Sequence, residues 1–96
     1  MEKLSQTELD KELSTLEGWT QKENSIIKTF LFKDFIEAFG FLSKVAIISE
    51  KLFHHPDWSG VYNKVVIQLS THEAGGITNN DIEFAKAVEG YLNSAE

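Results

Sequence analysis

Residues 34–70, DFIEAFGFLSKVAIISEKLFHHPDWSGVYNKVVIQLS, contain the change of pattern that decides the fold. Asp34, with Glu37 three residues later, is typical of a helix N-terminus, and apolar residues then recur at helical spacing. The helix has to end before Pro56, because proline disfavours helical geometry at the residue that precedes it. We therefore predict a helix from about Phe35 to Phe53.

After Pro56 the pattern changes from helical periodicity to alternation. Residues 57–62 form a first apolar and aromatic run, Asn63 interrupts it, and residues 64–70 form a second run in which every second residue is apolar. Strict alternation is typical of a strand with one buried face. The segment therefore predicts a pair of strands that follows the helix.

The amino-terminal third predicts a helix and another strand pair. Ser5 and Glu8 form a capping-box pattern, and leucines then recur at helical spacing until Gly18 stops the helix. Residues 19–32 are rich in β-branched and aromatic side chains, with a polar turn at 23–25. We expect a hairpin whose second strand covers residues 25–32.

The carboxy-terminal segment predicts a third helix. Gly75 and Gly76 break the chain, Thr78 and Asp81 again stand at capping-box spacing, and an apolar stripe follows to about Asn93. The order is therefore αββαββα. It predicts an α+β fold with one four-stranded antiparallel sheet and three helices packed on one face, in a single domain of residues 1–96.

The composition restricts the classes of partner. Nine lysines and no arginine stand against fifteen acidic residues, a net charge of −6 that disfavours direct nucleic-acid binding. The absence of cysteine removes disulfides and Cys-based zinc sites and is typical of a reducing compartment. No apolar stretch approaches the roughly 20 residues of a membrane span, and the amino terminus does not resemble a signal peptide. We expect a cytoplasmic protein with no membrane partner.

Three histidines, His54, His55 and His72, are the candidate residues for chemistry, because imidazole titrates near neutral pH. Glu50 lies four residues before His54, a helical spacing at which the carboxylate would orient the ring. Pro56 makes His55 extended, so the two adjacent rings should point in different directions.

The spacing of the histidines leaves alternatives open. Histidines at a helix end are often ordinary surface residues. A catalytic zinc is disfavoured, because adjacent histidines cannot easily reach one ion and the usual ligand spacings are missing, so we expect no metal. Ser70 or Thr71 as a nucleophile beside His72 is disfavoured more strongly, since adjacent strand residues point to opposite faces.

The arrangement Glu50-x3-His54-His55-Pro56-x5-Tyr62-x9-His72-x8-Asp81 resembles the signature of the pterin-4a-carbinolamine dehydratases, whose animal members double as dimerisation cofactors of a homeodomain transcription factor. The resemblance covers nearly the whole chain beyond its first dozen residues. It includes Gly18-Trp19, Phe32-Lys33-Asp34-Phe35, Ala38-Phe39, Tyr62-Asn63-Lys64-Val65 and Leu69-Ser70-Thr71-His72-Glu73.

The resemblance implies an αββαββα fold and a dehydration of 4a-hydroxytetrahydropterin to quinonoid dihydropterin, in tetrahydropterin recycling, without metal or cofactor. It implies that His54 and His72 are the general acid/base pair, that His55 positions substrate, that Glu50 orients His54, and that Asp81 sets His72 or its loop. The implied pterin site is lined by Phe53, His54, His55, Pro56, Ser70, Thr71, His72, Glu73 and Asp81. Trp19 is either a pterin-facing ring or part of the core.

A binding function is the alternative to an enzyme. Animal relatives bind the dimerisation helices of a partner, so the chain could be a helix-binding module with a vestigial pterin site. The intact set of Glu50 and three histidines argues against this, because a scaffold does not need three imidazoles.

The breadth of the apolar surface on the central helix predicts self-association. A stripe that includes Phe35, Phe39 and Leu42 is wide enough to cover the sheet, and Phe41 and Ile48 lie beside it toward Lys44. The resemblance implies dimers and tetramers through this helix and through sheet edges. We expect a homo-oligomer, a tetramer rather than a dimer, with Phe41, Lys44 and Ile48 in a closed symmetric contact.

Overall fold

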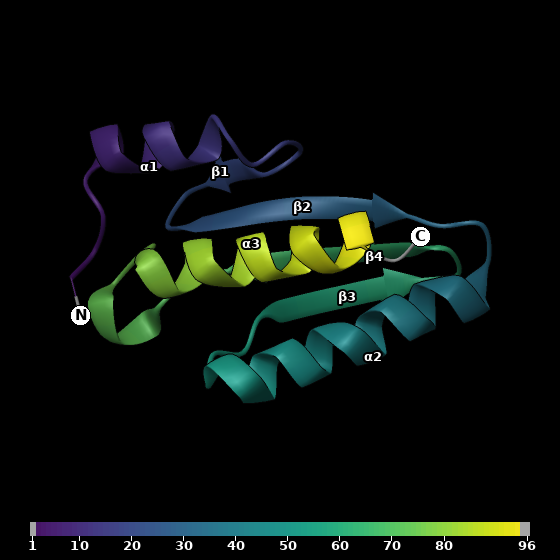
Figure 1. Cartoon of the computed structure of the whole chain (residues 1–96). Helices are drawn as coiled ribbons and strands as arrows, with labels where there is room; N and C mark the ends of the chain where they lie inside the picture. The colour runs from purple at the N-terminus through teal and green to yellow at the C-terminus, as the bar shows by residue number, and fades with distance from the viewer. Residues whose placement is uncertain (1, 95–96) are drawn as a thin grey trace.

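The computed structural model describes residues 2–94 and has the predicted αββαββα order (Figure 1). The helices are α1 (Gln6–Leu13), α2 (Phe35–Leu52) and α3 (Asn79–Ser94), and a short 3₁₀ helix, η1, covers His72–Ala74. The strands are β1 (Thr20–Lys22), β2 (Ser25–Leu31), β3 (Asp57–Val61) and β4 (Lys64–Leu69). No helix in this described part is both long and apolar enough to cross a membrane.

The four strands form one antiparallel sheet, as predicted, and their order in it is β1-β2-β4-β3. The two central strands come from different hairpins, and in their register Ile26 faces Leu69 and Phe30 faces Val65. These apolar residues and Ile67 are buried, so the alternation in the sequence marks the face of the sheet that meets the helices.

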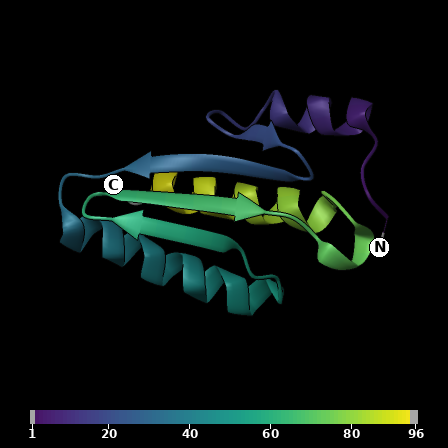
Figure 2. The same cartoon turned by 180° about the vertical axis from the view of Figure 1, so that it is seen from behind.

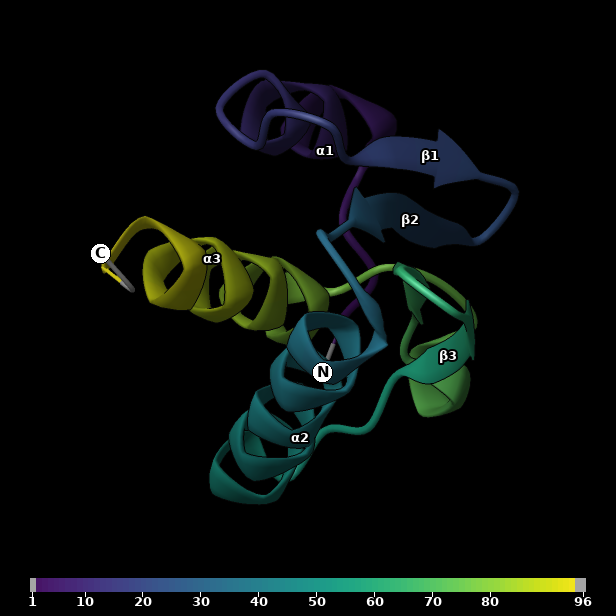
Figure 3. The same cartoon turned by 90° about the vertical axis from the view of Figure 1, so that its right-hand side faces the viewer.

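All three helices lie on one side of the sheet, which confirms the predicted α+β architecture. Figures 1 and 3 show α2 and α3 across this face and α1 beside β1, whereas the view from behind in Figure 2 shows strands with no helix in front of them. The largest fully buried side chains include Phe84, Ile82 and Val88 of α3, which lies against the middle of the sheet.

The first two helices begin at the predicted caps. The Ser5 hydroxyl accepts from the Glu8 N–H at 3.1 Å and the Glu8 carboxylate accepts from the Ser5 N–H, which completes the capping box. Helix α1 nevertheless ends at Leu13 and not near Gly18. Ser14 and Thr15 bond back to main-chain carbonyls through their hydroxyls, a local alternative to continued helix.

The face that helix α2 presents to the core coincides only in part with the predicted stripe, because Ala38 and Val45 are buried but Phe35 and Phe39 are 55% and 56% exposed. Phe41 and Ile48 are 3% and 9% exposed, so the prediction that they form an intermolecular contact is wrong. The reason is that α2 packs against α3 as well as against β4, which covers a second part of its circumference. Phe41 contacts Phe30 at 4.7 Å between ring centroids, and Lys44 lies over the Tyr91 ring of α3.

Candidate active site

The left-handed residue Phe53 ends helix α2 and sets the direction of both following histidines. Its φ is 52°, and the main-chain N–H groups of Phe53 and His54 both point to the Ser49 carbonyl. The helix therefore stops at Leu52, before the constraint from Pro56 acts. The chain turns so that the Phe53 side chain is 90% exposed whereas the His54 side chain is only 11% exposed.

His54 is bound to Asp81, in the first turn of α3. The distance from His54 Nε2 to Asp81 Oδ1 is 2.5 Å, and the Asp81 carboxylate is fully buried. Its other oxygen accepts from the Thr71 hydroxyl at 3.0 Å and from the Thr78 N–H at 2.8 Å. Asp81 thus orients His54 directly, and through Thr71 it contacts the loop that precedes His72, which agrees with the second of the two expected roles, that Asp81 sets the loop of His72 and not the ring itself.

Glu50 is bound to His55 and not to His54. Its Oε2 lies 2.7 Å from His55 Nε2, and both side chains are largely exposed. The expected pairing with His54 is therefore wrong. The four-residue spacing aligns side chains only within a helix, and the left-handed turn at Phe53 rotates His54 inward before the pairing can form.

A groove of about 260 Å³ lies between α2 and the edge strand β3, beside the Glu50–His55 pair. It is lined by Leu42, Val45, Ala46, Ser49, Glu50, His55, Pro56 and Trp58. Trp58 was not among the predicted site residues. The only signal for it in the sequence is its position two residues after Pro56, which does not distinguish a groove residue from a core residue.

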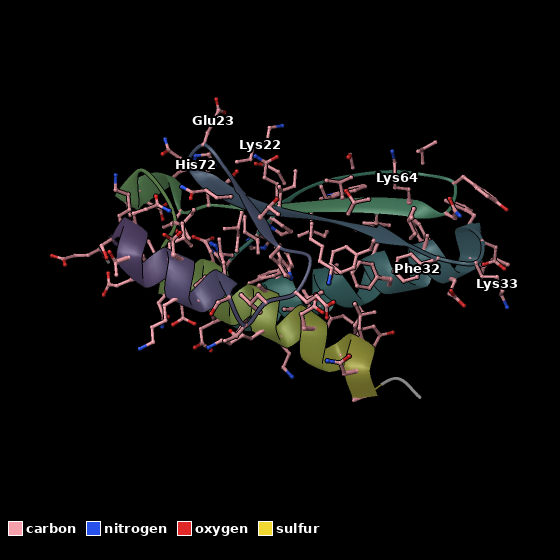
Figure 4. All side chains as sticks on the ribbon, turned by 90° about the horizontal axis from the view of Figure 1, so that it is seen from above. Lys22, Glu23, Phe32, Lys33, Lys64 and His72 are labelled. Atoms are coloured by element: carbon pink, nitrogen blue, oxygen red, sulfur yellow. The ribbon has the colours of Figure 1, made fainter. Side chains whose placement is uncertain are left out.

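His72 lies on η1 at the far end of β4. Its side chain is exposed, as is that of Glu73, while Ser70 is half-buried and Thr71 is buried. Figure 4 shows His72 near the end of the sheet where the β1–β2 turn, with Lys22 and Glu23, also lies. Asp81 connects the 53–55 and 70–73 segments, because its carboxylate binds both His54 and the Thr71 hydroxyl. His72 is the next residue along the chain after Thr71.

Trp19 is part of the core and is not a pterin-facing ring. It is 3% exposed, packs edge-on against Phe30, and donates its indole N–H to Glu89 at 3.0 Å. Glu89 also binds Lys28 at 2.8 Å. These contacts connect the β1–β2 hairpin to α3.

Residues 2–94 contain no cluster of three His, Asp or Glu side chains close enough to hold one metal ion. The two His–carboxylate pairs, His54–Asp81 and His55–Glu50, are separate. Each pair holds an imidazole in a fixed orientation by means of a carboxylate. Imidazoles positioned in this way are suited to proton transfer.

These features define the class of protein, an αββαββα domain with carboxylate-oriented histidines beside its sheet. Residues 2–91 match the family described as Pterin 4 alpha carbinolamine dehydratase, and the chain belongs to this family.

Relatives support the assignment over nearly the whole chain. A Prochlorococcus marinus protein is 50% identical over 95% of this chain and 96% of its own length, and one from Sulfurisphaera tokodaii is 51% identical over 96% and 99%; the names of both assign them provisionally as pterin-4-alpha-carbinolamine dehydratases. A Brucella melitensis structure described as a transcriptional coactivator/pterin dehydratase has a TM-score of 0.88 at 39% identity, covering 92% of this chain and 96% of that one. A pterin dehydratase-like protein identified as a RuBisCO assembly factor in the alpha-carboxysome has a TM-score of 0.64 at 25% identity, covering 79% and 88%.

Proposed function

We propose that this protein catalyses the dehydration of 4a-hydroxytetrahydropterin to quinonoid dihydropterin by general acid/base catalysis from histidine. The observation that carries the proposal is the buried His54–Asp81 pair in a member of the dehydratase family.

The reaction requires one acid and one base. The C4a–O bond breaks, the departing hydroxyl takes a proton and leaves as water, and N5 loses its proton as the C4a=N5 double bond forms. Each positioned acid or base contributes about 10²- to 10⁴-fold, so two histidines supply much of the acceleration that a labile carbinolamine needs.

His54 is suited to one of these transfers through its Nδ1. Its Nε2 is directed at Asp81, an ionised carboxylate in this proposal, so Nε2 carries the proton that is donated. No described residue bonds Nδ1, and no buried side-chain polar atom among them lacks a partner, so Nδ1 is open to solvent or substrate. An Asp–His pair of this kind fixes the tautomer and stabilises the imidazolium that forms.

The remaining predicted site residues take the roles that the resemblance implies, with partners corrected by the contacts. His72 is proposed as the second acid/base group, on the segment that adjoins Thr71. His55, held by Glu50 at the groove, is proposed to position the pterin. Phe53, Pro56, Ser70, Thr71 and Glu73 are proposed to line the site around these groups.

A direct assay tests this proposal. Adding the purified protein to freshly generated 4a-hydroxytetrahydropterin is expected to accelerate the appearance of quinonoid absorbance above the spontaneous rate. Exhaustive chelation is expected to leave that rate unchanged, since the proposed chemistry uses imidazole alone. No acceleration would refute the dehydratase, and stoichiometric zinc lost together with activity would refute the metal-free route.

We also propose that the chain forms a homo-oligomer through the outer band of α2, the face opposite the core, made of Ile36, Phe39, Ser43, Ala46 and Ile47. Ile36 is 82% exposed and Ile47 is 52% exposed. These side chains recur at helical spacing on one apolar face, and covering each large one stabilises an assembly by about 1.5 to 3 kcal/mol. The same band is what a helix-binding module would offer to a partner helix.

Placing a charge in the outer band is expected to reduce the assembly without unfolding the subunit. Ile47→Lys should shift the protein to a smaller species in light scattering, because the introduced ammonium group would have to be desolvated in the contact. Leu31→Lys, on the uncovered face of the sheet and 71% exposed, is the matched control and should leave the assembly unchanged. A wild-type protein that sediments as a monomer at micromolar concentration would contradict the proposal.

A further inference from the structure

A chain of buried hydroxyl groups lies behind the His54–Asp81 pair. Thr78 and Asp81 are fully buried and Thr71 is 6% exposed. The Thr71 and Thr78 hydroxyl oxygens are 2.8 Å apart, and the Thr71 hydroxyl also lies 3.0 Å from Asp81 Oδ2.

The directions of these hydrogen bonds follow from counting protons. A carboxylate can only accept, so the single hydroxyl proton of Thr71 is donated to Asp81. The proton between the two threonines must then come from Thr78, whose oxygen in turn accepts from the Asn80 N–H at 3.2 Å. Every bond in the chain is oriented toward Asp81, and such aligned bonds polarise one another.

Thr71 connects this chain to the second proposed histidine. Its main-chain N–H donates to the Gly76 carbonyl at 2.8 Å, and its carbonyl accepts from the Ala74 N–H, which closes the turn that carries His72. The Thr71 side chain therefore holds Asp81 while its main chain holds the His72 turn.

We propose that Thr78 is a positioning residue for the dehydration. Acting through Thr71, its hydroxyl holds the Asp81 carboxylate in the orientation that keeps His54 Nδ1 directed at substrate. This inference rests on the proposed function. The inference adds Thr78 to the residues of the proposed site. The sequence marks Thr78 only as a helix cap, and Thr78 touches neither His54 nor His72.

Two substitutions at Thr78 separate the hydroxyl from the shape of the side chain. Thr78→Val preserves shape but removes the proton given to Thr71, and it is expected to lower kcat about tenfold with KM within about twofold, equivalent to about 1.4 kcal/mol of barrier. Thr78→Ser restores the hydroxyl and should restore kcat. Thr78→Ala removes the same hydroxyl with a smaller side chain and provides the same test if Thr78→Val does not fold. Thr71→Val leaves the Thr78–Asn80 cap intact and tests the next link, the direct bond to Asp81.

A readout independent of turnover distinguishes this inference from the proposed function. In wild-type protein the His54 Nε2 proton should give a downfield NMR resonance that exchanges slowly with water, because Asp81 holds it. In Thr78→Val or Thr71→Val the resonance should move upfield and exchange faster, and in Thr78→Ser it should return. An unchanged resonance would overturn the positioning role even in an active enzyme, whereas a shifted resonance in a protein without dehydratase activity would refute only the proposed function.

Discussion

Replacing His54 by alanine is expected to lower kcat/KM for the dehydration by about a hundredfold or more. The substitution removes Nδ1, the nitrogen left open by the Asp81 bond, and with it one of the two proposed proton transfers. His72→Ala should have an effect of at least tenfold by the same reasoning. His72→Ala should retain the wild-type unfolding midpoint within a few degrees. His54→Ala takes a partner from the buried Asp81 carboxylate and should lower the midpoint, so its activity is measured at a temperature where circular dichroism shows the variant folded.

His55→Ala is the matched control among the three histidines. Its ring is exposed and bound to Glu50, so its loss should raise KM more than it lowers kcat. The measurement is a full saturation curve for each variant after subtraction of the spontaneous rate. Wild-type turnover in the His54→Ala, His72→Ala double variant would exclude both residues as the acid/base pair.

Replacing Ile48 by glutamate is expected to unfold the protein or come close to it. Ile48 is 9% exposed on the face of α2 that packs in the core, so the substitution places an unpaired carboxylate among apolar side chains. An uncompensated buried charge costs about 3 to 5 kcal/mol, a large share of the roughly 5 to 15 kcal/mol that stabilises a typical domain.

The neighbouring Ile47 provides the control for this loss of stability. It is 52% exposed, so Ile47→Glu should change the free energy of unfolding of the isolated subunit by no more than about 0.5 kcal/mol. Urea unfolding followed by circular dichroism, at a concentration where the subunits are dissociated, measures both variants. Equal stability of the two would show that α2 does not pack as described.

The contrast between Ile47 and Ile48 also shows where the prediction from sequence failed for α2. The helix is apolar around much of its circumference, so periodicity predicts that it is amphipathic but does not define one buried face. The face that is buried depends on α3, which packs against α2 from a distant part of the chain. Phe41 and Ile48 lie on the buried face of α2 and belong to the core of one subunit.

The candidate site shows the same division between local and tertiary information. The sequence identified the histidines, Glu50 and Asp81, because proton-transfer residues are chemically distinctive and stand in a recognisable pattern. It paired Glu50 with the wrong histidine, because the left-handed turn at Phe53 redirects His54 away from α2 and toward Asp81, and leaves His55 beside Glu50. Thr78 was predicted only as a cap, since nothing local indicates that its hydroxyl faces Thr71.

The sequence by itself determined the order of the helices and strands, the caps at Ser5 and Asp34, and the buried face of β4, because each depends on residues within a few positions of one another. Only the tertiary structure decided which face of α2 is buried, that Asp81 binds His54, and that Trp19 lies in the core and donates a hydrogen bond to Glu89. These contacts join residues 27 and 70 positions apart in two of the cases, and their formation depends on how whole elements pack against the sheet. Local propensity and periodicity carry no information about that packing, since the same side chains satisfy their local preferences in either arrangement.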